Sequence, residues 1–327
     1  MSIFVVMLFE YESLKPSFLL KSGNLNTILT NQKRIIADVS YNRKRVTTSD
    51  GDFLDLDYSK VGSKKIMLLL HGLEGSSNRQ YAKGMVKIFN QNGFDAVIMN
   101  FRSCSGEMNT KPTTYHSGKT DDLDFVIESI QAEYEEIVPI GFSLGGNVLV
   151  KYLGEKGNDI SGKVKKAVAF SVPFQLADSA KELSKRKNWI YMRRFLKSLK
   201  FKTRIKINQF PELGISEEQV NQCKSFIDFD DLYTAPVHGF KNAEDYWEQC
   251  SSKQFIKDIS IPTLVVNALD DPFLGTECYP TKEAELNLNF TFLSLKYGGH
   301  VGFGESFDFS KSLWSERLAL QFVMADK

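Results

Sequence analysis

A serine in the segment GFSLG (141–145) is the residue of this chain best placed to do chemistry. The GxSxG pattern lies between the apolar run EIVPIG and a helical pattern that begins with GNVLVKYL. A serine held on a sharp strand-to-helix turn needs glycine neighbours, because larger side chains would collide with the turn. The start of the following helix also favours the negative charge that develops during an attack. We therefore predict that Ser143 is a nucleophile.

A serine hydroxyl needs a base to take its proton and an acid to orient that base. In α/β-hydrolases the acid and then the histidine follow the serine in the chain. His71 and His116 precede Ser143, and His238 falls in a presumed cap. His300, in YGGHVGF, follows the last predicted strand, and the glycines around it suit a loop tip. We expect His300 to be the base.

The acid of such a site should follow the strand before the histidine loop, where NALDDPF places Asp270 and Asp271. We prefer Asp271 because it directly precedes Pro272, as the acid does in GxxDP versions of this turn, with Ala268 in the place of the glycine. Asp270 would then cap the turn or face solvent. The choice between the two carboxylates stays open at this point.

The oxyanion formed on an attacked carbonyl needs backbone N–H donors held in place beforehand. The N–H of Leu144, which follows the nucleophile, is one expected donor. The loop LLLHGLEGSS (68–77) should supply the second through the N–H of Leu73, with Gly72 keeping the backbone open. We interpret His71 in this loop as structural rather than as a base.

Alternating strand and helix patterns must position these residues. An antiparallel hairpin is predicted over residues 43–59, turning at Asp50-Gly51. Short apolar runs then alternate with helical patterns, which favours a mostly parallel twisted sheet with helices on both faces, the α/β-hydrolase fold class. The strands are predicted at 65–70, 94–100, 136–141, 165–171, 262–268 and 291–296, and the helices at about 78–91, 119–134, 144–156 and 310–325.

The interval 173–258 breaks this rhythm, because it has helical periodicity and no strand signal. Such a long stretch inside a sheet domain is best explained as a helical cap between two strands. The predicted division is therefore a core of residues 1–172 and 259–327 with a cap of 173–258. Between Lys181 and Lys206 the cap carries eleven basic residues and one acid, Glu182. Trp189, Met192, Leu196 and Leu199 are spaced to form one apolar helical face. This face could contact an anionic membrane weakly, but packing on the core is the favoured interpretation.

Composition limits the possible classes of function. Lys and Arg total 41 and Asp and Glu total 40, for a net charge of +1, so nothing indicates a nucleic-acid partner. The four cysteines form no CxxC pair and no zinc spacing, which predicts a reduced, cytoplasmic protein without a metal site. The apolar start MSIFVVMLF lacks the basic region and cleavage site of a signal peptide. We expect it to be a packed strand or an over-long start.

The loop NFRSCSGE follows a predicted strand, so its Arg102 and Glu107 could line the site. Buried charge pairing that packs the loop is the preferred interpretation. Asp121 and Asp122 begin a predicted helix and should serve its N-terminal dipole.

Five motifs in order, HGLEGSS, NFRSCSGE, GFSLGGN, NALDDPF and YGGHVGF, resemble those of the YheT-like α/β-hydrolases, the AB hydrolase 4 family. GNLNTI (23–28) resembles the opening segment of that family, and DDLYTAPVHGF (230–240) resembles its cap signature, so the similarity covers nearly the whole chain. Ser103 is a small departure, since the family commonly has glycine there. The family includes bacterial esterases, yeast medium-chain acyltransferase/esterases and animal lipid hydrolases.

The resemblance implies that Ser143, Asp271 and His300 form a charge relay that hydrolyses acyl esters through an acyl-enzyme. The expected substrate is a small-molecule ester with a short- to medium-chain or lipid-derived acyl group, and no cofactor or metal is expected. Transfer of the acyl group to an alcohol instead of water is the first alternative. A catalytically silent binding protein on the same fold is the second.

Overall fold

The structure is a computed structural model that describes residues 11–325. One eight-stranded sheet organises the chain, in the order β1-β2-β4-β3-β5-β6-β7-β8. β2 pairs antiparallel with β1 and β4, and the other neighbours are parallel, as the predicted fold class requires. The strands are β1 (Asn42–Thr47), β2 (Phe53–Ser59), β3 (Lys65–Leu70), β4 (Asp95–Asn100), β5 (Glu136–Phe142), β6 (Ala167–Phe170), β7 (Thr263–Ala268) and β8 (Phe290–Leu295).

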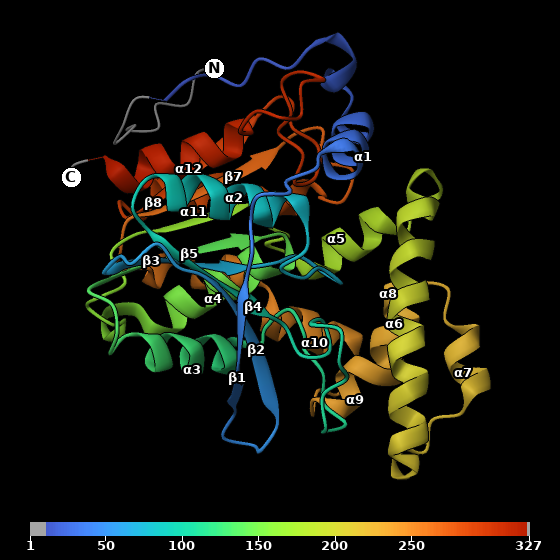
Figure 1. Cartoon of the computed structure of the whole chain (residues 1–327). Coiled ribbons are helices and arrows are strands. Elements are labelled where there is room, and N and C mark those ends of the chain that lie inside the picture. The colour runs from blue at the N-terminus through green and yellow to red at the C-terminus, as the bar shows by residue number, and fades with distance from the viewer. Residues whose placement is uncertain (1–10, 326–327) are drawn as a thin grey trace.

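Helices cover both faces of the sheet (Figure 1). Side chains alternate across β3: Leu68 packs in one core layer and Leu69 in the other. Each central strand therefore reads as a continuous apolar run, because both of its faces are buried. One layer contains α2 (Gln80–Gln91) and α12 (Trp314–Met324), and the other contains α3 (Thr120–Ile130) and α4 (Leu144–Lys156).

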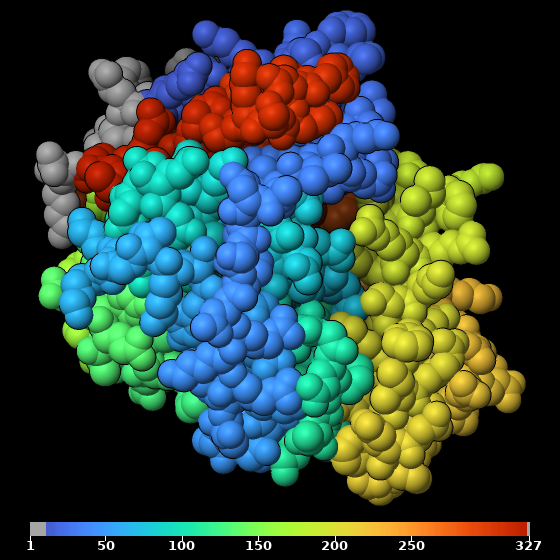
Figure 2. All heavy atoms as spheres, in the orientation of Figure 1, coloured from blue at the N-terminus to red at the C-terminus, as the bar shows by residue number. Residues whose placement is uncertain are grey.

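The cap consists of helices between β6 and β7, and no strand occurs in residues 173–258. In Figure 2 the cap, yellow to orange, lies along one side of the core. A π-helical turn, Asp230–Thr234, falls in the DDLYT part of the predicted cap signature. The helices are α5 (Leu176–Leu183), α6 (Trp189–Gln209), α7 (Glu217–Gln222), α8 (Phe226–Phe229), α9 (Ala235–Val237) and α10 (Ala243–Cys250).

Several predicted boundaries differ from the structure. The hairpin turn is a five-residue connection, 48–52, in which only Gly51 has a positive φ, because the Asp50 carboxylate caps the turn by accepting from Thr48 Oγ1 and Asp52 N–H. α12 begins at 314 rather than 310, where Glu316 accepts the Leu313 N–H at 3.0 Å. Helices α1 (Gly23–Lys33) and α11 (Thr281–Glu285) were not predicted. The predicted N-terminal strand or over-long start, residues 1–9, lies outside the described residues.

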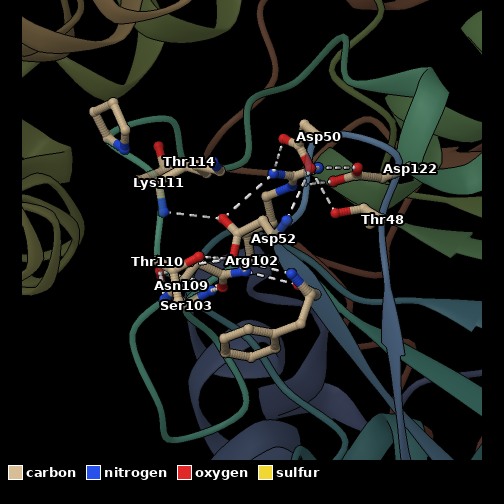
Figure 3. A network of polar contacts seen from close by, with 12 residues as sticks. Thr48, Asp50, Asp52, Arg102, Ser103, Asn109, Thr110, Lys111, Thr114 and Asp122 are labelled. Carbon is tan, nitrogen blue, oxygen red and sulfur yellow. Dashed lines mark hydrogen bonds and ion pairs between the residues drawn. The ribbon is translucent and has the colours of Figure 1, made fainter.

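Arg102 anchors the loop after β4 through ion pairs of its buried guanidinium (Figure 3). Its guanidinium lies 2.7 Å from both Asp50 and Asp122, so the buried-pairing interpretation is right for this residue. It is wrong for Glu107, whose side chain is 61 % exposed and pairs with Arg45 across the surface. Asp122 does lie in the first turn of α3, but its buried carboxylate also bonds Arg102 and is not a helix-dipole residue alone.

Ser103 has a left-handed backbone, with a φ of 61°. A residue without a side chain adopts this conformation at the lowest cost, which explains why the resembling family commonly has glycine here. The Ser103 hydroxyl offsets part of that cost, since it accepts a hydrogen bond from the Asn109 N–H at 3.1 Å.

Candidate active site

Ser143 lies on a strained turn between the end of β5 and the start of α4, with a φ of 53°. The turn is packed so tightly that a side chain at Gly141 would come within 2.6 Å of the Gly145 carbonyl oxygen. Only glycine fits there, and the tight approach leaves the Ser143 side chain projecting from the turn. The predicted GFSLG turn is therefore present as expected.

The structure brings together the three side chains that the sequence singled out. Ser143 Oγ lies 2.8 Å from His300 Nε2, and His300 Nδ1 lies 2.8 Å from Asp271 Oδ2. The Asp271 side chain is fully buried, and its other oxygen accepts the Phe273 N–H at 2.8 Å. A buried carboxylate on Nδ1 holds the ring in the tautomer that leaves Nε2 free to take a proton from the serine. This geometry is suited to nucleophilic catalysis.

Asp270, the alternative acid, points elsewhere. Its Oδ1 accepts the Gly299 N–H at 2.8 Å, and its Oδ2 is buried without a hydrogen-bond partner. Burial raises the pKa of this carboxyl above its ordinary value. Asp270 thus fixes the backbone of the histidine loop, while Asp271 contacts the imidazole.

Three contacts that the sequence did not suggest hold His300 in place. Thr27 Oγ1, on the unpredicted helix α1, accepts the His300 N–H at 2.8 Å. Ser171 Oγ accepts the next N–H, that of Val301, at 2.9 Å. The Phe273 ring lies against the imidazole, with 4.1 Å between ring centroids. GNLNTI was noticed only as part of a family resemblance, and its polar Asn26 and Thr27, both buried, were the available signal.

Two backbone N–H groups flank Ser143 without a hydrogen-bond partner in residues 11–325, those of Leu73 and Leu144. A side chain at Gly72 would come within 3.2 Å of Ser143 Cβ, so the loop that carries Leu73 lies directly against the nucleophile. The arrangement fits the two predicted oxyanion donors. His71 in this loop is fully buried: its Nε2 accepts the Phe101 N–H, and burial lowers its pKa to about 4. It stabilises the loop, as expected.

A cavity of about 130 Å³, called the inner cavity below, leads from Ser143 and His300 into the cap. Its walls are mostly apolar and come from α5, α6, α8, α10, the segment after β7 and the loop before α3, so most of the cavity is suited to a hydrocarbon chain. Four charged side chains also line it, those of Glu74, Arg102, Lys202 and Asp230. The apolar lining side chains are Leu73, Leu144, Leu176, Ala180, Leu183, Phe195, Leu199, Phe226, Phe229, Trp247 and Phe273.

A second cavity of about 260 Å³, called the outer cavity below, opens on the other side of Ser143, His300 and Leu73. Its wall is more polar and includes α1, the start of α2 and the outer side of α6. Two guanidinium groups line it, those of Arg79 and Arg194. Neither makes an ion pair with any carboxylate in the part of the chain that the structure describes. The serine therefore stands between a mostly apolar cavity and a second cavity that is lined by two guanidinium groups and the Glu74 carboxylate.

The rings of the remaining histidines, His116 and His238, contact each other at an angle of 58°, with 4.5 Å between ring centroids, and His116 lines the inner cavity. Burial lowers the pKa of His238 to about 4. Within residues 11–325 there is no group of three or more His, Cys, Asp or Glu side chains that could hold a metal ion. The same residues contain no helix long and apolar enough to cross a membrane.

Known proteins resemble this chain over most of its length. The alpha/beta hydrolase fold family matches residues 65–305. The candidate esterase YheT of Escherichia coli (strain K12) is 37% identical, over 80% of this chain and 78% of its own. Phospholipase ABHD3 of Bos taurus is 30% identical over 88% of this chain and 72% of its own. A monoacylglycerol lipase of Saccharomyces cerevisiae is 29% identical over 73% of this chain and 55% of its own. The Pyrococcus furiosus esterase Pf2001 superimposes with a TM-score of 0.57 at 16% identity, over 89% of this chain and 97% of its own.

Proposed function

The chain belongs to the alpha/beta hydrolase family, within it to the YheT-like group, and is a carboxylic ester hydrolase; from this premise we propose that Ser143, His300 and Asp271 are its catalytic triad. The observation that carries the proposal is the continuous chain of two 2.8 Å contacts from Ser143 Oγ through the imidazole to the buried carboxylate. The esterase and lipase relatives favour an active enzyme over a silent binding protein.

In the proposed first half-reaction, Ser143 Oγ attacks the ester carbonyl carbon while its proton moves to His300 Nε2. The carbonyl oxygen becomes an oxyanion that accepts hydrogen bonds from the Leu73 and Leu144 N–H groups. Asp271 stabilises the imidazolium that forms. When the carbon–oxygen bond of the leaving alcohol breaks, His300 gives it the proton, and the acyl group stays on Ser143.

In the second half-reaction, water enters from the outer cavity and gives its proton to His300 as it attacks the acyl-enzyme. The acid leaves once the proton has returned to Ser143 Oγ. An alcohol in place of water would give a new ester, which is the acyltransferase alternative. The two outcomes differ only in the second nucleophile, so product analysis with added ethanol separates them.

For the substrate, we propose a lipid-derived acyl ester, with its hydrocarbon chain in the apolar cavity and its leaving alcohol in the outer one. The guanidinium groups of Arg79 and Arg194 make no ion pair in residues 11–325, although Arg79 donates to the Glu74 carbonyl, and they favour a leaving alcohol that carries a phosphate over neutral glycerol. Relatives include both a phospholipase and a monoacylglycerol lipase, so both kinds of substrate are reasonable candidates.

The test combines labelling of Ser143 with a substrate panel. Wild type should react with a fluorophosphonate probe and hydrolyse p-nitrophenyl esters, and Ser143→Ala should lose labelling and at least ~10³-fold of kcat, while Tm stays near that of wild type. Persistent hydrolysis by a folded Ser143→Ala protein would refute the triad. Monoacylglycerol and acylglycerol phosphate of equal chain length complete the panel, and equal rates would exclude the proposed preference for phosphate.

The proposal also covers the location of the protein in the cell and its contact with lipid surfaces. The four cysteines are free thiols, which fits the cytoplasm. The outer side of α6 exposes Trp189 and Ile190 among basic residues, which supports weak contact with an anionic lipid surface.

A further inference from the structure

Glu74 lies between the loop that carries Leu73 and cap helix α6, and the triad chemistry does not use it. Its Oε1 accepts Lys202 Nζ at 2.8 Å, and its other oxygen accepts the Ser198 hydroxyl. Both partners lie on α6, four residues apart and thus on one face of the helix. The side chain is only 8 % exposed, so this ion pair is largely removed from water.

The backbone of Glu74 is held as firmly as its side chain. Its φ is 54°, a left-handed conformation that a residue with a side chain keeps only when surrounding contacts enforce it. The Tyr115 hydroxyl accepts the Glu74 N–H at 2.9 Å and donates to Glu74 Oε1 at 2.7 Å. Arg79 donates to the Glu74 carbonyl at 2.6 Å. These contacts fix the peptide groups on both sides of Glu74. The Leu73 N–H belongs to the adjoining Gly72–Leu73 peptide, whose carbonyl accepts the Gly75 N–H at 2.9 Å within the same turn.

A carboxylate beside an oxyanion site is unfavourable by itself, because its negative charge opposes the charge that develops on the substrate. Here Lys202 balances that charge, and hydroxyl groups satisfy the rest of the carboxylate. The balancing cation comes from the cap rather than from the loop. When α6 moves away, Glu74 loses both of its cap partners and keeps only its contacts with Tyr115 and Arg79, which leaves its carboxylate without a balancing cation.

We propose that Glu74 is a positioning residue that couples the seating of cap helix α6 to the orientation of the Leu73 N–H. This inference rests on the proposed function, in which Leu73 is an oxyanion donor. With α6 seated over an acyl chain, Lys202 and Ser198 hold Glu74, and the Leu73 N–H faces the substrate carbonyl. The oxyanion site is then complete only when the chamber for the acyl chain is closed.

A second lysine of α6 offers a matched control. Lys206 is fully buried, and its Nζ donates to the backbone carbonyls of Asn109 and Lys111. It therefore also ties α6 to the core, one turn from Lys202, but it does not contact the loop of Leu73 and does not line the inner cavity. Loss of cap attachment in general would affect both lysines, whereas the proposed coupling involves Lys202 alone.

The experiment compares Glu74→Gln, Lys202→Met, their double variant, Lys202→Arg and Lys206→Met in the full chain. Steady-state kinetics use p-nitrophenyl butyrate, and Tm is measured for each protein. A boronic acid inhibitor, which forms a tetrahedral adduct on a reactive serine, reports the oxyanion site directly. We expect Glu74→Gln and Lys202→Met to lower kcat about 10- to 100-fold with KM within ~3-fold, and to weaken the boronic acid about 10-fold.

The double variant should lose no more than the worse single variant, because both changes break one interaction. Lys202→Arg should restore most of kcat, and Lys206→Met should lower Tm while kcat stays within ~2-fold of wild type. The proposal is overturned if folded Lys202→Met keeps kcat, if the boronic acid binds it as tightly as wild type, or if Lys206→Met loses as much kcat. Loss of folding in Lys202→Met leaves Glu74→Gln to decide the matter alone. Full activity in Ser143→Ala would instead refute the underlying triad.

Discussion

At the scale of single residues, two adjacent carboxylates after β7 have different partners. Asp271 contacts His300 Nδ1, and Asp270 contacts the Gly299 N–H. Asp271→Asn should lower kcat by ~10³–10⁴, because an amide that donates to the imidazole favours the wrong tautomer. Asp270→Asn keeps an oxygen that can accept the Gly299 N–H, so its kcat should stay within roughly fivefold of wild type.

The measurement is kcat for p-nitrophenyl butyrate, with Tm recorded for both variants. Similar losses of kcat in the two proteins would contradict the assignment of Asp271. A fall in Tm that tracks the fall in kcat would show that the loop, and not the proton on His300, had been disturbed.

The nucleophile and base could be found from sequence because each carries a local signature. GFSLG marks the turn of Ser143, and chain order together with the predicted cap leaves His300 as the one candidate base among the histidines. Thr27 and Phe273 could not be found in this way, since each acts through a contact that exists only after distant segments meet. Asp271 lies between these cases: its turn was recognisable, but only the geometry separates it from Asp270.

At the scale of elements, the cap contains a buried carboxyl that no sequence pattern predicted. Asp230, in the π-helical turn, is 8 % exposed and accepts Trp247 Nε1–H at 2.9 Å. Burial raises its pKa from 3.8 to about 6, with a further contribution from nearby Asp231. Because the folded state holds this proton to higher pH than the unfolded chain, stability should fall as pH rises from about 4 to about 6.

Asp230→Asn removes this titration and leaves an oxygen for Trp247. Relative to wild type, the variant should gain stability as pH increases through that window, by up to ~3 kcal/mol above pH 6. Denaturant unfolding of both proteins between pH 4 and pH 8 provides the measurement. Asp245→Asn serves as the control of opposite sign, since backbone and side-chain hydrogen bonds lower the pKa of exposed Asp245. A pH-independent difference between wild type and Asp230→Asn would contradict the prediction.

Element types were predictable where periodicity was strong. The central strands are apolar on both faces, so β3, β5 and β7 stood out as continuous runs. The absence of such runs predicted a helical cap. Helix α1 was missed because its buried residues are polar and do not form an apolar stripe. Asn26 and Thr27 bond the segment around His300, and Thr30 donates to Asn26 Oδ1. Periodicity detects burial of apolar side chains, and α1 is held by hydrogen bonds.

At the scale of the whole molecule, the basic residues of α6 divide into two groups, one directed into the protein and one exposed at the surface. Lys202 and Lys206 point into the protein and tie the cap to the core. Met192 and Leu196 are buried, so the favoured interpretation of a packed apolar face holds for these residues. Trp189 is 55 % exposed, which separates it from the apolar face that the sequence suggested. The charges and apolar groups left outside form a surface suited to anionic lipid.

This surface leads to a prediction that can be read from intrinsic fluorescence. Among the three tryptophans, Trp247 and Trp314 are buried and Trp189 is exposed. Vesicles containing anionic phospholipid should therefore shift the emission of the protein to shorter wavelength through Trp189, and neutral vesicles should not. The shift should disappear in Trp189→Phe and weaken as salt rises from about 0.05 to 0.5 M, because exposed charges are screened. An unchanged emission spectrum with anionic vesicles at low salt would mean that the basic face of the cap is simply solvated.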